Sequence, residues 1–393
     1  VGMGTNYGPE FAKDWGLWVY GDGQLDIQCT PKTGWNRTGS DPTWRPDDEY
    51  WITPTASGDF KPRRWRPGDP IPRVDGSVPA AEVVNVTRDC RITGPGHIFI
   101  RSTKPSRIEY VRLERMGIAQ HSSKLDLVTS RYALHFHFAG DGSRGSIVRG
   151  VAAVNSEGTV FVPHASHGIT FIDNVSVNSY GPGFWWDHGH LTNDVSVDRL
   201  LVTGVHFPRE VSGRTSYVNG VELMFGENMT MNNSVVAGVS GSYDSHGFLW
   251  PEHPRCNCEK SVWEFRGNVA HNNQGDGVRF WVNDADPHEV HDLVVYRNGD
   301  YGIEQGAYLN AVRYFNTTIF EDELTHKSSA RKVDDRGNPA GHYGLRIINP
   351  SGPQIRLGNA AIPPIGVRTE FENCQLTGAS PKVVVMPNES PIY

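Results

Sequence analysis

Two histidines separated by one residue, His135 and His137, stand in the segment YALHFHFAGD at residues 132–141. Apolar residues alternate with them: Leu134, Phe136 and Phe138. This alternation predicts a strand with one apolar face and both imidazoles on the other, exposed face. Imidazole can accept or donate a proton near neutral pH and is a common metal ligand. The segment therefore predicts a chemically active sheet face.

A loose repeat follows this strand and predicts how the histidines are positioned. Each unit has a short strand, a turn, a second strand with an Asn or Asp in its middle, and a closing glycine. Four glycines, at steps of 27, 30 and 25 residues, each open a strand: Gly220, Gly247, Gly277 and Gly302. Irregular periods of this length are typical of a solenoid, whereas propeller blades are more regular, and no segment has sustained helical periodicity. The sequence predicts an all-β protein, with a short N-terminal β region over 1–80 and a right-handed parallel β-helix over 81–393.

Equivalent positions of successive coils stack about 4.8 Å apart in such a solenoid. Aligning the coils by their opening strands predicts two inward columns: Leu134, Phe161 and Phe184, and Phe136, Pro163 and Trp186. One outward column is predicted to contain His135, Val162, Trp185, Glu222, Leu249, Arg279 and Glu304. Its neighbour is predicted to contain His137, His164 and Asp187, then Met224, Pro251 and Trp281. His97 is expected to extend the outward histidine column by one coil.

The ladder of His137, His164 and Asp187 could hold a divalent metal with open coordination positions. Alternatively, Asp187 orients an imidazole that works as an acid or base. A third interpretation is structural, with stacked histidines that satisfy turn carbonyls. The histidine density within 56 residues favours function: His135, His137, His164, His188 and His190.

A stripe of ionisable and aromatic side chains on one sheet is what a polysaccharide groove would need, and for such a substrate two routes of glycosidic cleavage remain open from the sequence. Hydrolysis needs two carboxyl groups, for which Asp187 and Glu222 are the best pair. Elimination next to a uronate needs a base, His137 or His164, and a neutralising cation, Arg279 or a metal. The predicted catalytic residues are His135, His137, His164, Asp187 and Glu222. The predicted substrate-binding residues are Trp185, His188, His253, Arg279 and Trp281.

Composition limits the other functions. The net charge of −7 argues against a general nucleic-acid or membrane-surface role, and no apolar run approaches the ~20 residues that span a bilayer. The basic run KPRRWRPGDPIPR, residues 61–73, is either a loop over the core or a clamp for a polyanion. One or two disulfides are expected, and no cysteine zinc site, among Cys29, Cys90, Cys256, Cys258 and Cys374.

Several segments, in order, resemble the hyaluronan-depolymerising family that includes the cell migration-inducing hyaluronan-binding protein and the transmembrane cell-surface hyaluronidase. They are AEVVNVTRDCRITG, GHIFI, VRLERMG, YALHFHFAGD, VPHASHG and HGFLWPEHP. The likeness covers about residues 17–310, is dense in 81–190, and makes the N-terminal segment similar to the end of an eight-glycine domain. It implies a right-handed β-helix and extracellular, calcium-aided cleavage of hyaluronan. This chain has Asp187-His188 where the family commonly has Glu-Asp. Of the properties that the resemblance implies, the identity of the substrate is therefore the least transferable to this chain.

The sequence thus predicts a secreted or extracellular enzyme that cleaves an anionic polysaccharide, hyaluronan or a related glycosaminoglycan. It is either a hydrolase or a lyase. The expected cofactor is a divalent metal: calcium by resemblance, or zinc or another transition metal if His137, His164 and Asp187 bind it. Two alternatives stay open, a non-catalytic carbohydrate-binding or adhesion β-helix and a metal-dependent enzyme of another class.

Overall fold

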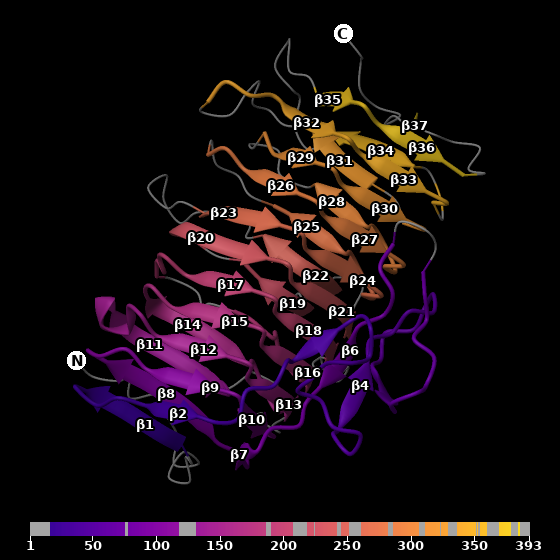
Figure 1. Ribbon diagram of the computed structural model, residues 1–393. Helices are drawn as coiled ribbons and strands as arrows, with labels where there is room; N and C mark the ends of the chain where they lie inside the picture. The colour runs from indigo at the N-terminus through magenta and orange to yellow at the C-terminus, as the bar shows by residue number, and fades with distance from the viewer. Residues whose placement is uncertain are drawn as a thin grey trace.

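The computed structural model describes residues 16–74, 78–117, 131–185, 190–206, 218–223, 225–241, 245–250, 261–281, 286–305, 311–322, 324–328, 336–350, 352, 354–359, 369–378 and 384–385. Three parallel sheets wind into a solenoid whose coils stack from the N-terminal to the C-terminal end (Figure 1). The predicted all-β, right-handed parallel β-helix is confirmed. Within the described ranges the only helical element is the short 3-10 turn η2 (Asp141–Ser143).

The first sheet contains the histidine strand. Its N-terminal block is β1 (Gly16–Gly21), β8 (His97–Ser102), β11 (Leu134–Gly140) and β14 (Phe161–Ser166). Its C-terminal block is β19 (Val218–Glu222), β22 (Ser245–Trp250), β25 (Val278–Phe280), β28 (Ile303–Gln305), β31 (Leu324–Ser328), β34 (Ile355–Asn359) and β37 (Val384–Val385). Phe184 bridges the two blocks, because it pairs with Phe161 on one side and Val221 on the other.

The second and third sheets each have eleven strands. The second is β2 (Asp26–Gln28), β9 (Arg107–Glu109), β12 (Ile147–Arg149), β15 (Thr170–Ile172), β17 (Ser196–Asp198), β20 (Gly226–Asn232), β23 (Ser261–Arg266), β26 (Glu289–His291), β29 (Arg313–Phe315), β32 (Ala340–Tyr343) and β35 (Thr369–Glu372). The third is β7 (Cys90–Thr93), β10 (Val111–Glu114), β13 (Ala152–Ser156), β16 (Val175–Ser179), β18 (Leu201–His206), β21 (Val235–Ser240), β24 (Val269–His271), β27 (Val294–Tyr296), β30 (Thr318–Phe320), β33 (Arg346–Ile348) and β36 (Gln375–Thr377).

The chain turns sharply where each second-sheet strand from β9 to β35 is followed by a third-sheet strand. The first residue after the second-sheet strand has positive φ in each of these coils: Tyr110, Gly150, Asp173, Arg199, Asn233, Gly267, Asp292, Asn316, Gly344 and Asn373. Asn, Asp and Gly tolerate this left-handed conformation best, which explains their recurrence in the repeat. An Asn or Asp therefore recurs at the corner between two strands, whereas Asn155 in β13 and Asn178 in β16 lie within strands as the repeat predicts.

The interior of the solenoid is apolar, as the alternation of each strand requires. The predicted inward column of Leu134, Phe161 and Phe184 is fully buried in this core, as is Phe136. Inward side chains of all three sheets meet there, so burial of the large aromatic rings fixes which face of each strand points outward. The outward columns then follow from the same register.

The N-terminal region does not form a separate unit. Strands β1 and β2 pair in parallel with β8 and β9, so residues 16–28 build the first coil. The chain then leaves the solenoid and forms an antiparallel sheet of β3 (Trp35–Asn36), β6 (Val83–Asn85), β4 (Tyr50–Ile52) and β5 (Arg63–Trp65). Strand β6 belongs to this sheet, so no break in the sheets falls at the boundary of residue 80 expected from the sequence.

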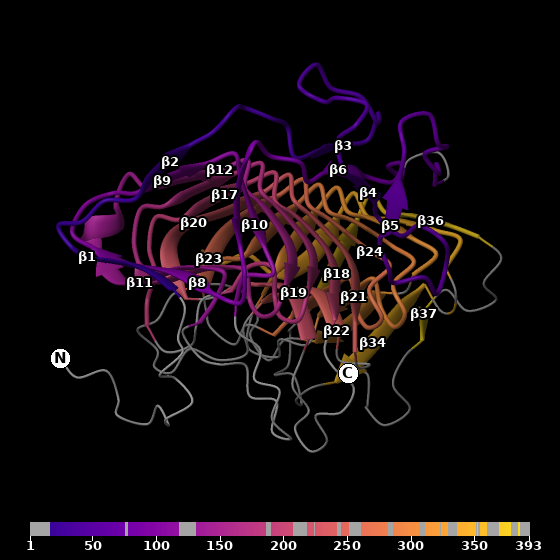
Figure 2. The same cartoon turned by 90° about the horizontal axis from the view of Figure 1, so that it is seen from below.

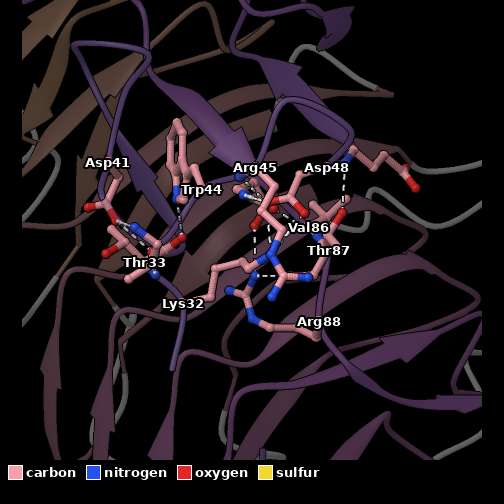
Figure 3. Close-up of polar contacts among 12 residues, drawn as sticks. Lys32, Thr33, Asp41, Trp44, Arg45, Asp48, Val86, Thr87 and Arg88 are labelled. Atoms are coloured by element: carbon pink, nitrogen blue, oxygen red, sulfur yellow. Dashed lines mark hydrogen bonds and ion pairs between the residues drawn. The ribbon is translucent and has the colours of Figure 1, made fainter. Parts of the chain in front are cut away.

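We call residues 29–88 the strap, which lies outside the solenoid along the third sheet (Figure 2). Trp35, Val84 and Val86 of the strap pack in one cluster with outward valines of that sheet, including Val154 and Val177. The buried ion pair of Lys32 Nζ and Asp48 Oδ2, 2.8 Å apart, ties the strap internally (Figure 3). A disulfide joins Cys29, at its start, to Cys90 in β7.

The basic run is part of the strap, and two of its arginines are paired with carboxylates. Arg63 forms an ion pair with Asp59, and Arg64 forms one with Glu49 while lying over the ring of Trp51. These contacts favour the interpretation of the run as a segment fastened over the core.

Candidate active site

Strand register brings the histidines of adjacent coils together. His137 of β11 pairs directly with His164 of β14, and His135 pairs with Val162. The predicted register of both outward columns is confirmed for these strands. On the preceding coil, however, Phe99 of β8 is the partner of His135, so the expectation that His97 extends the histidine column is wrong. His97 lies two residues earlier on β8 and pairs with Gly16.

Four imidazoles, which we call the histidine cluster, form a continuous chain of contacts. His135 Nε2 lies 3.2 Å from His137 Nδ1, and His137 Nδ1 lies 3.2 Å from His164 Nδ1. His164 Nε2 lies 3.3 Å from His190 Nδ1. The ligand nitrogens of His135, His137 and His164 all lie within 4.8 Å of one another. The predicted pairing of His137 with His164 is therefore present, and His135 and His190 join it.

Aromatic rings cover much of the cluster, although its side chains point out of the solenoid. His135 is fully buried and His164 is 5% exposed, whereas His137 is half-buried and His190 is exposed. Phe99 and Tyr132 pack their rings edge-on against His135, with centroids 5.3 and 4.8 Å away. The prediction of an exposed face is thus wrong for His135, because aromatic residues from neighbouring segments pack over it.

Phe138 closes the cluster from the other side. The register shifts between His137 and Gly140, and Phe138 has φ of 48°, a conformation that is costly for a residue with a side chain. This bend places its ring 4.6 Å from the ring of His164 and 4.5 Å from that of His190. Backbone strain is therefore located where it orients a ring over the histidines.

Burial keeps His137 and His164 uncharged at neutral pH. It lowers the pKa of His137 to about 4, and the nearby charges of Arg101, His190 and Arg131 lower it further in the same direction. Burial likewise lowers the pKa of His164 to about 3, helped by His137 and His190. The cluster thus offers nitrogen lone pairs at neutral pH.

Two arginines missed by the sequence argument give the region positive charge. Arg101 follows Phe99 by two residues on β8, so it lies on the outward row of His137. Arg131 is buried and lies 5.0 Å over the ring of Trp18. Both act on the pKa of His137. The outward alternation of HIFIRS could have identified Arg101 if β8 had been aligned on Phe99.

Trp185 is half-buried and packs edge-on against Tyr132, with ring centroids 5.5 Å apart. The outward column continues from it to Glu222, which is 9% exposed and accepts a hydrogen bond of 3.2 Å from Asn219. Glu222 is three strands beyond His135, about 14 Å at the ordinary strand spacing. The structure does not bring Glu222 into the histidine cluster.

Arg279 lies further along the same column, in a second polar group. Its Nε is 3.1 Å from Glu304 Oε2, and its guanidinium lies 4.6 Å over the ring of Trp281. His246 faces Arg279 through Nε2 at 3.3 Å and Asp276 through Nδ1 at 2.9 Å. Arg279 and Trp281, both predicted to bind substrate, are thus adjacent, and Glu304 already forms an ion pair with Arg279.

Several predicted residues lie outside the described ranges. These are Asp187, His188 and His253, together with Trp186, Met224 and Pro251 of the predicted columns. The proposed hydrolytic pair of Asp187 and Glu222 and the metal ladder through Asp187 therefore stay predictions.

The family resemblance implies calcium, and the described residues of the cluster do not fit it. Calcium takes six to eight oxygen ligands, whereas the cluster presents imidazole nitrogens. Imidazole nitrogens suit first-row transition metals instead.

A cavity of about 300 Å³ lies at the N-terminal end of the solenoid. Its lining comprises Gly16, Leu17, Ile92, Thr93, Gly94, Pro95, Gly96, His97, Ile98 and Met116. None of the four clustered histidines lines it, so this cavity is separate from the candidate site.

Comparison with known families agrees with the sequence. Residues 93–215 match the family model described as CEMIP beta-helix, which confirms over this stretch the likeness to the hyaluronan-depolymerising family. The matched stretch contains all four residues of the histidine cluster. No curated protein matches the chain.

Solved structures give only a weak likeness. The periplasmic alginate epimerase AlgG is 13% identical with a TM-score of 0.24, over 74% of this chain and 64% of that one. The A-module of the Azotobacter vinelandii mannuronan C-5 epimerase AlgE4 is 12% identical with a TM-score of 0.23, over 76% of this chain and 90% of that one. Similarity at this level carries no argument about the site.

Proposed function

We propose that this protein is an extracellular enzyme that cleaves an acidic polysaccharide of the hyaluronan type on the outer face of its first sheet. One observation supports the proposal most: four contacting imidazoles lie beside Arg101 and Arg131. Uncharged bases next to cations are what a negatively charged sugar and its abstractable proton require. The family match over the same residues supports hyaluronan or a related glycosaminoglycan as the substrate class.

Of the two cleavage routes, the described residues favour β-elimination. Hydrolysis would instead use two carboxyl groups, Asp187 and Glu222, and Glu222 lies about 14 Å along the sheet from His135. Elimination needs a base and a cation at the uronate carboxylate, and both are present. An imidazole removes the proton next to the carboxylate while Arg101 holds its charge. The bond to the leaving glycosidic oxygen then breaks, a double bond forms in the sugar ring, and the departing oxygen takes up a proton from an imidazolium or from water.

Solvent exposure indicates which imidazoles can reach substrate. His135 and His164 are buried, whereas His137 is half-buried and His190 is exposed. The proton therefore enters the cluster at His137 or His190. Contacts through His164 can then spread the positive charge to the neighbouring rings.

The length of the outward column suits a polymer. From His135 to Arg279 the column crosses five strand spacings, about 24 Å, which is the length of several sugar units. Aromatic rings beside the column, Trp185 and Trp281, can stack on sugar faces. The column therefore offers binding positions on both sides of a cleaved bond.

The disulfide of Cys29 and Cys90 supports secretion, since such bonds persist in oxidising compartments. No helix among the described residues is long and apolar enough to cross a membrane.

The test is incubation of the full chain with a panel of hyaluronan, unsulfated chondroitin, alginate and polygalacturonate. The proposal expects shortened hyaluronan or chondroitin chains whose new ends carry the ultraviolet absorbance of an unsaturated uronate. Shortened chains without that absorbance would support the proposal that the protein is a cleaving enzyme, but would show that it works by hydrolysis and not by elimination. Binding to the polymers with no shortening would favour the alternative of a carbohydrate-binding β-helix.

A further inference from the structure

We propose that His135, His137 and His164 bind one divalent transition-metal ion of zinc-like chemistry. The ligand atoms are Nε2 of His135 and Nδ1 of both His137 and His164. This site differs from the ladder expected from sequence, because buried His135 takes the place of Asp187. The inference deepens the proposed function, on whose site it rests, but it can be measured without any substrate.

Nitrogen-to-nitrogen distances match a shared metal. Zinc binds imidazole nitrogen at 2.0–2.1 Å, so two nitrogens of a tetrahedral site lie about 3.3–3.4 Å apart. The contacts from His137 Nδ1 to His135 Nε2 and to His164 Nδ1 are both 3.2 Å. The remaining pair, His135 and His164, lies within 4.8 Å, and a side-chain rotation of about 1 Å at each closes that edge.

The fourth histidine, His190, orients the ligand His164 through a hydrogen bond. Metal-binding histidines usually donate the hydrogen of their other ring nitrogen to a nearby acceptor, which fixes the tautomer. His164 Nε2 lies 3.3 Å from His190 Nδ1, so His164 can bind metal through Nδ1 while its Nε2–H donates to His190. His190 is then a positioning residue for His164.

Surrounding residues favour a nitrogen-binding metal over a hard cation. Within the described part of the cluster the donors are three imidazoles, a set that suits zinc, copper, nickel or iron and not calcium or magnesium. The rings of Phe99 and Tyr132 pack over buried His135, and the exposed ring of Phe138 packs against His164 on the other side. Half-buried His137 marks the open side, where a fourth position can take water or a sugar carboxylate.

A hydrogen-bonded network without metal is the competing explanation. In that arrangement His137 Nδ1 carries no proton and accepts from His135 and His164 together. Metal binding would instead use one unprotonated nitrogen of each histidine, and the two pairs that involve His137 are already 3.2 Å apart. The two explanations differ in metal content, which is directly measurable.

The experiment uses the full chain, stripped with a chelator and then dialysed against Zn²⁺. Metal content by mass spectrometry and calorimetric titration with Zn²⁺ are measured, and Co²⁺ is used as a spectroscopic probe. We expect one equivalent of zinc, visible bands typical of a tetrahedral Co²⁺ site, and no displacement by Ca²⁺. His135→Ala and His164→Ala should each weaken binding at least a hundredfold, and His190→Ala about tenfold to a hundredfold.

His206→Ala is the matched control, since His206 lies on β18 and contacts Ser240 instead of the cluster. It should bind zinc like the unmodified chain, and circular dichroism should show that all variants keep the fold. Failure of the stripped, folded chain to take up zinc, or undiminished uptake by His135→Ala and His164→Ala, would overturn the metal site. Polysaccharide cleavage without metal uptake would leave the proposed function standing, and uptake without cleavage would do the reverse.

Discussion

An imidazole loses its charge readily when apolar rings surround it, and the histidine cluster is built in this way. Phe99, Tyr132 and Phe138 cover rings that point away from the solenoid core. Outward direction in a β-helix therefore does not mean exposure to water. At this position it produces a dry group of bases at the edge of a positively charged region.

His137 is the residue whose removal should affect chemistry most and the fold least. It contacts both His135 and His164, yet it is only half-buried, so truncation leaves little cavity. We expect His137→Ala to lower kcat/KM on the cleaved polymer at least a hundredfold, the usual range for losing an acid–base or metal-binding group. Melting temperature measured alongside should stay close to that of the unmodified chain. A near-normal rate would remove the cluster from the mechanism.

Arg101 offers a separate test of what the site recognises. Its charge acts on His137 from the neighbouring strand, so it can pair with a uronate carboxylate held there. We expect Arg101→Gln to reduce kcat/KM at least tenfold on a uronate polymer, and Arg101→Lys to restore part of it. The same measurement on a polymer whose carboxyl groups have been reduced is the control. Equal losses on both polymers would show that Arg101 does not bind the carboxylate.

Sequence reasoning located the histidines because strand alternation and coil stacking fix register. Leu134, Phe161 and Phe184 had to point inward together, and this placed His137 beside His164. It missed Arg101 because the preceding coil was aligned on a histidine, His97, instead of on Phe99. The match of one histidine to another gave the wrong register there, whereas the alternation of inward and outward residues along β8 gives the correct one.

At the scale of the strands, the corner residues and the close contacts between coils limit which residues the sequence can accept. One left-handed residue follows each second-sheet strand from β9 to β35, and seven of the ten are not glycine. In the sequence these corner positions are visible only as recurring Asn and Asp, and their positive φ is not. Their conformation depends on the sharp turn between two sheets, which periodicity alone does not show.

Asn316 tests the corner directly, because it is exposed and has φ of 54°. Asn316→Val should lower the free energy of unfolding by about 1–2 kcal/mol, since a branched side chain tolerates this conformation poorly. Asn316→Gly should be within about 0.5 kcal/mol of the unmodified chain, because glycine adopts the conformation freely and only an exposed hydrogen bond to Asp292 is lost. Urea unfolding of the two variants checks this. Equal effects would mean that the side chain matters and not the backbone.

Glycine at the opening of first-sheet strands has a steric role. A Cβ on Gly277 would lie 2.6 Å from the carbonyl oxygen of Gly302 and 2.7 Å from Asn298 Nδ2. We expect Gly277→Ala to destabilise the protein by about 2–3 kcal/mol, because backbone of the next coil must move.

Gly58→Ala is the comparison for this variant. No atom lies within 4 Å of a Cβ at Gly58, so only its φ of 75° opposes the change, at about 1 kcal/mol. Thermal unfolding of both variants distinguishes crowding from backbone strain. A Gly277→Ala protein no less stable than Gly58→Ala would show that the coils can separate there.

At the scale of the whole molecule, β1 and β2 belong to the first coil of the solenoid, the chain then leaves it as the strap, and it returns at β7. Composition changes near residue 80 suggested a boundary there, but the strap uses β6 in its own sheet and packs on the third sheet. Pairings such as Trp35 with Val84 join residues far apart in sequence, and local pattern does not specify them. The strap therefore contributes to the stability of the β-helix.

Glu82 connects the strap to the solenoid in a fully buried position. Its Oε2 lies 3.1 Å from Nε2 of His271 on β24 and accepts a 2.8 Å hydrogen bond from Thr53, while Oε1 lies 3.0 Å from Arg37. Burial alone would raise the pKa of Glu82, but the contacts with His271, Arg37 and Thr53 outweigh it and lower that pKa from 4.5 to about 2. The ionised form of Glu82 is therefore the form that the folded protein stabilises.

A depressed carboxyl pKa stabilises the fold above the unfolded value of 4.5, and this contribution is lost as pH falls from 4.5 to about 2. The shift corresponds to a contribution on the order of 3 kcal/mol at neutral pH. We expect Glu82→Gln to lose stability of that order at pH 7 and to show a shallower decline than the unmodified chain on acidification from 4.5 to 2. Asp292→Asn, which removes an exposed ion pair with Arg266, should change stability by less than about 1 kcal/mol. Urea unfolding across this pH range measures both, and parallel acid profiles for Glu82→Gln and the unmodified chain would show that Glu82 does not fasten the strap through its charge.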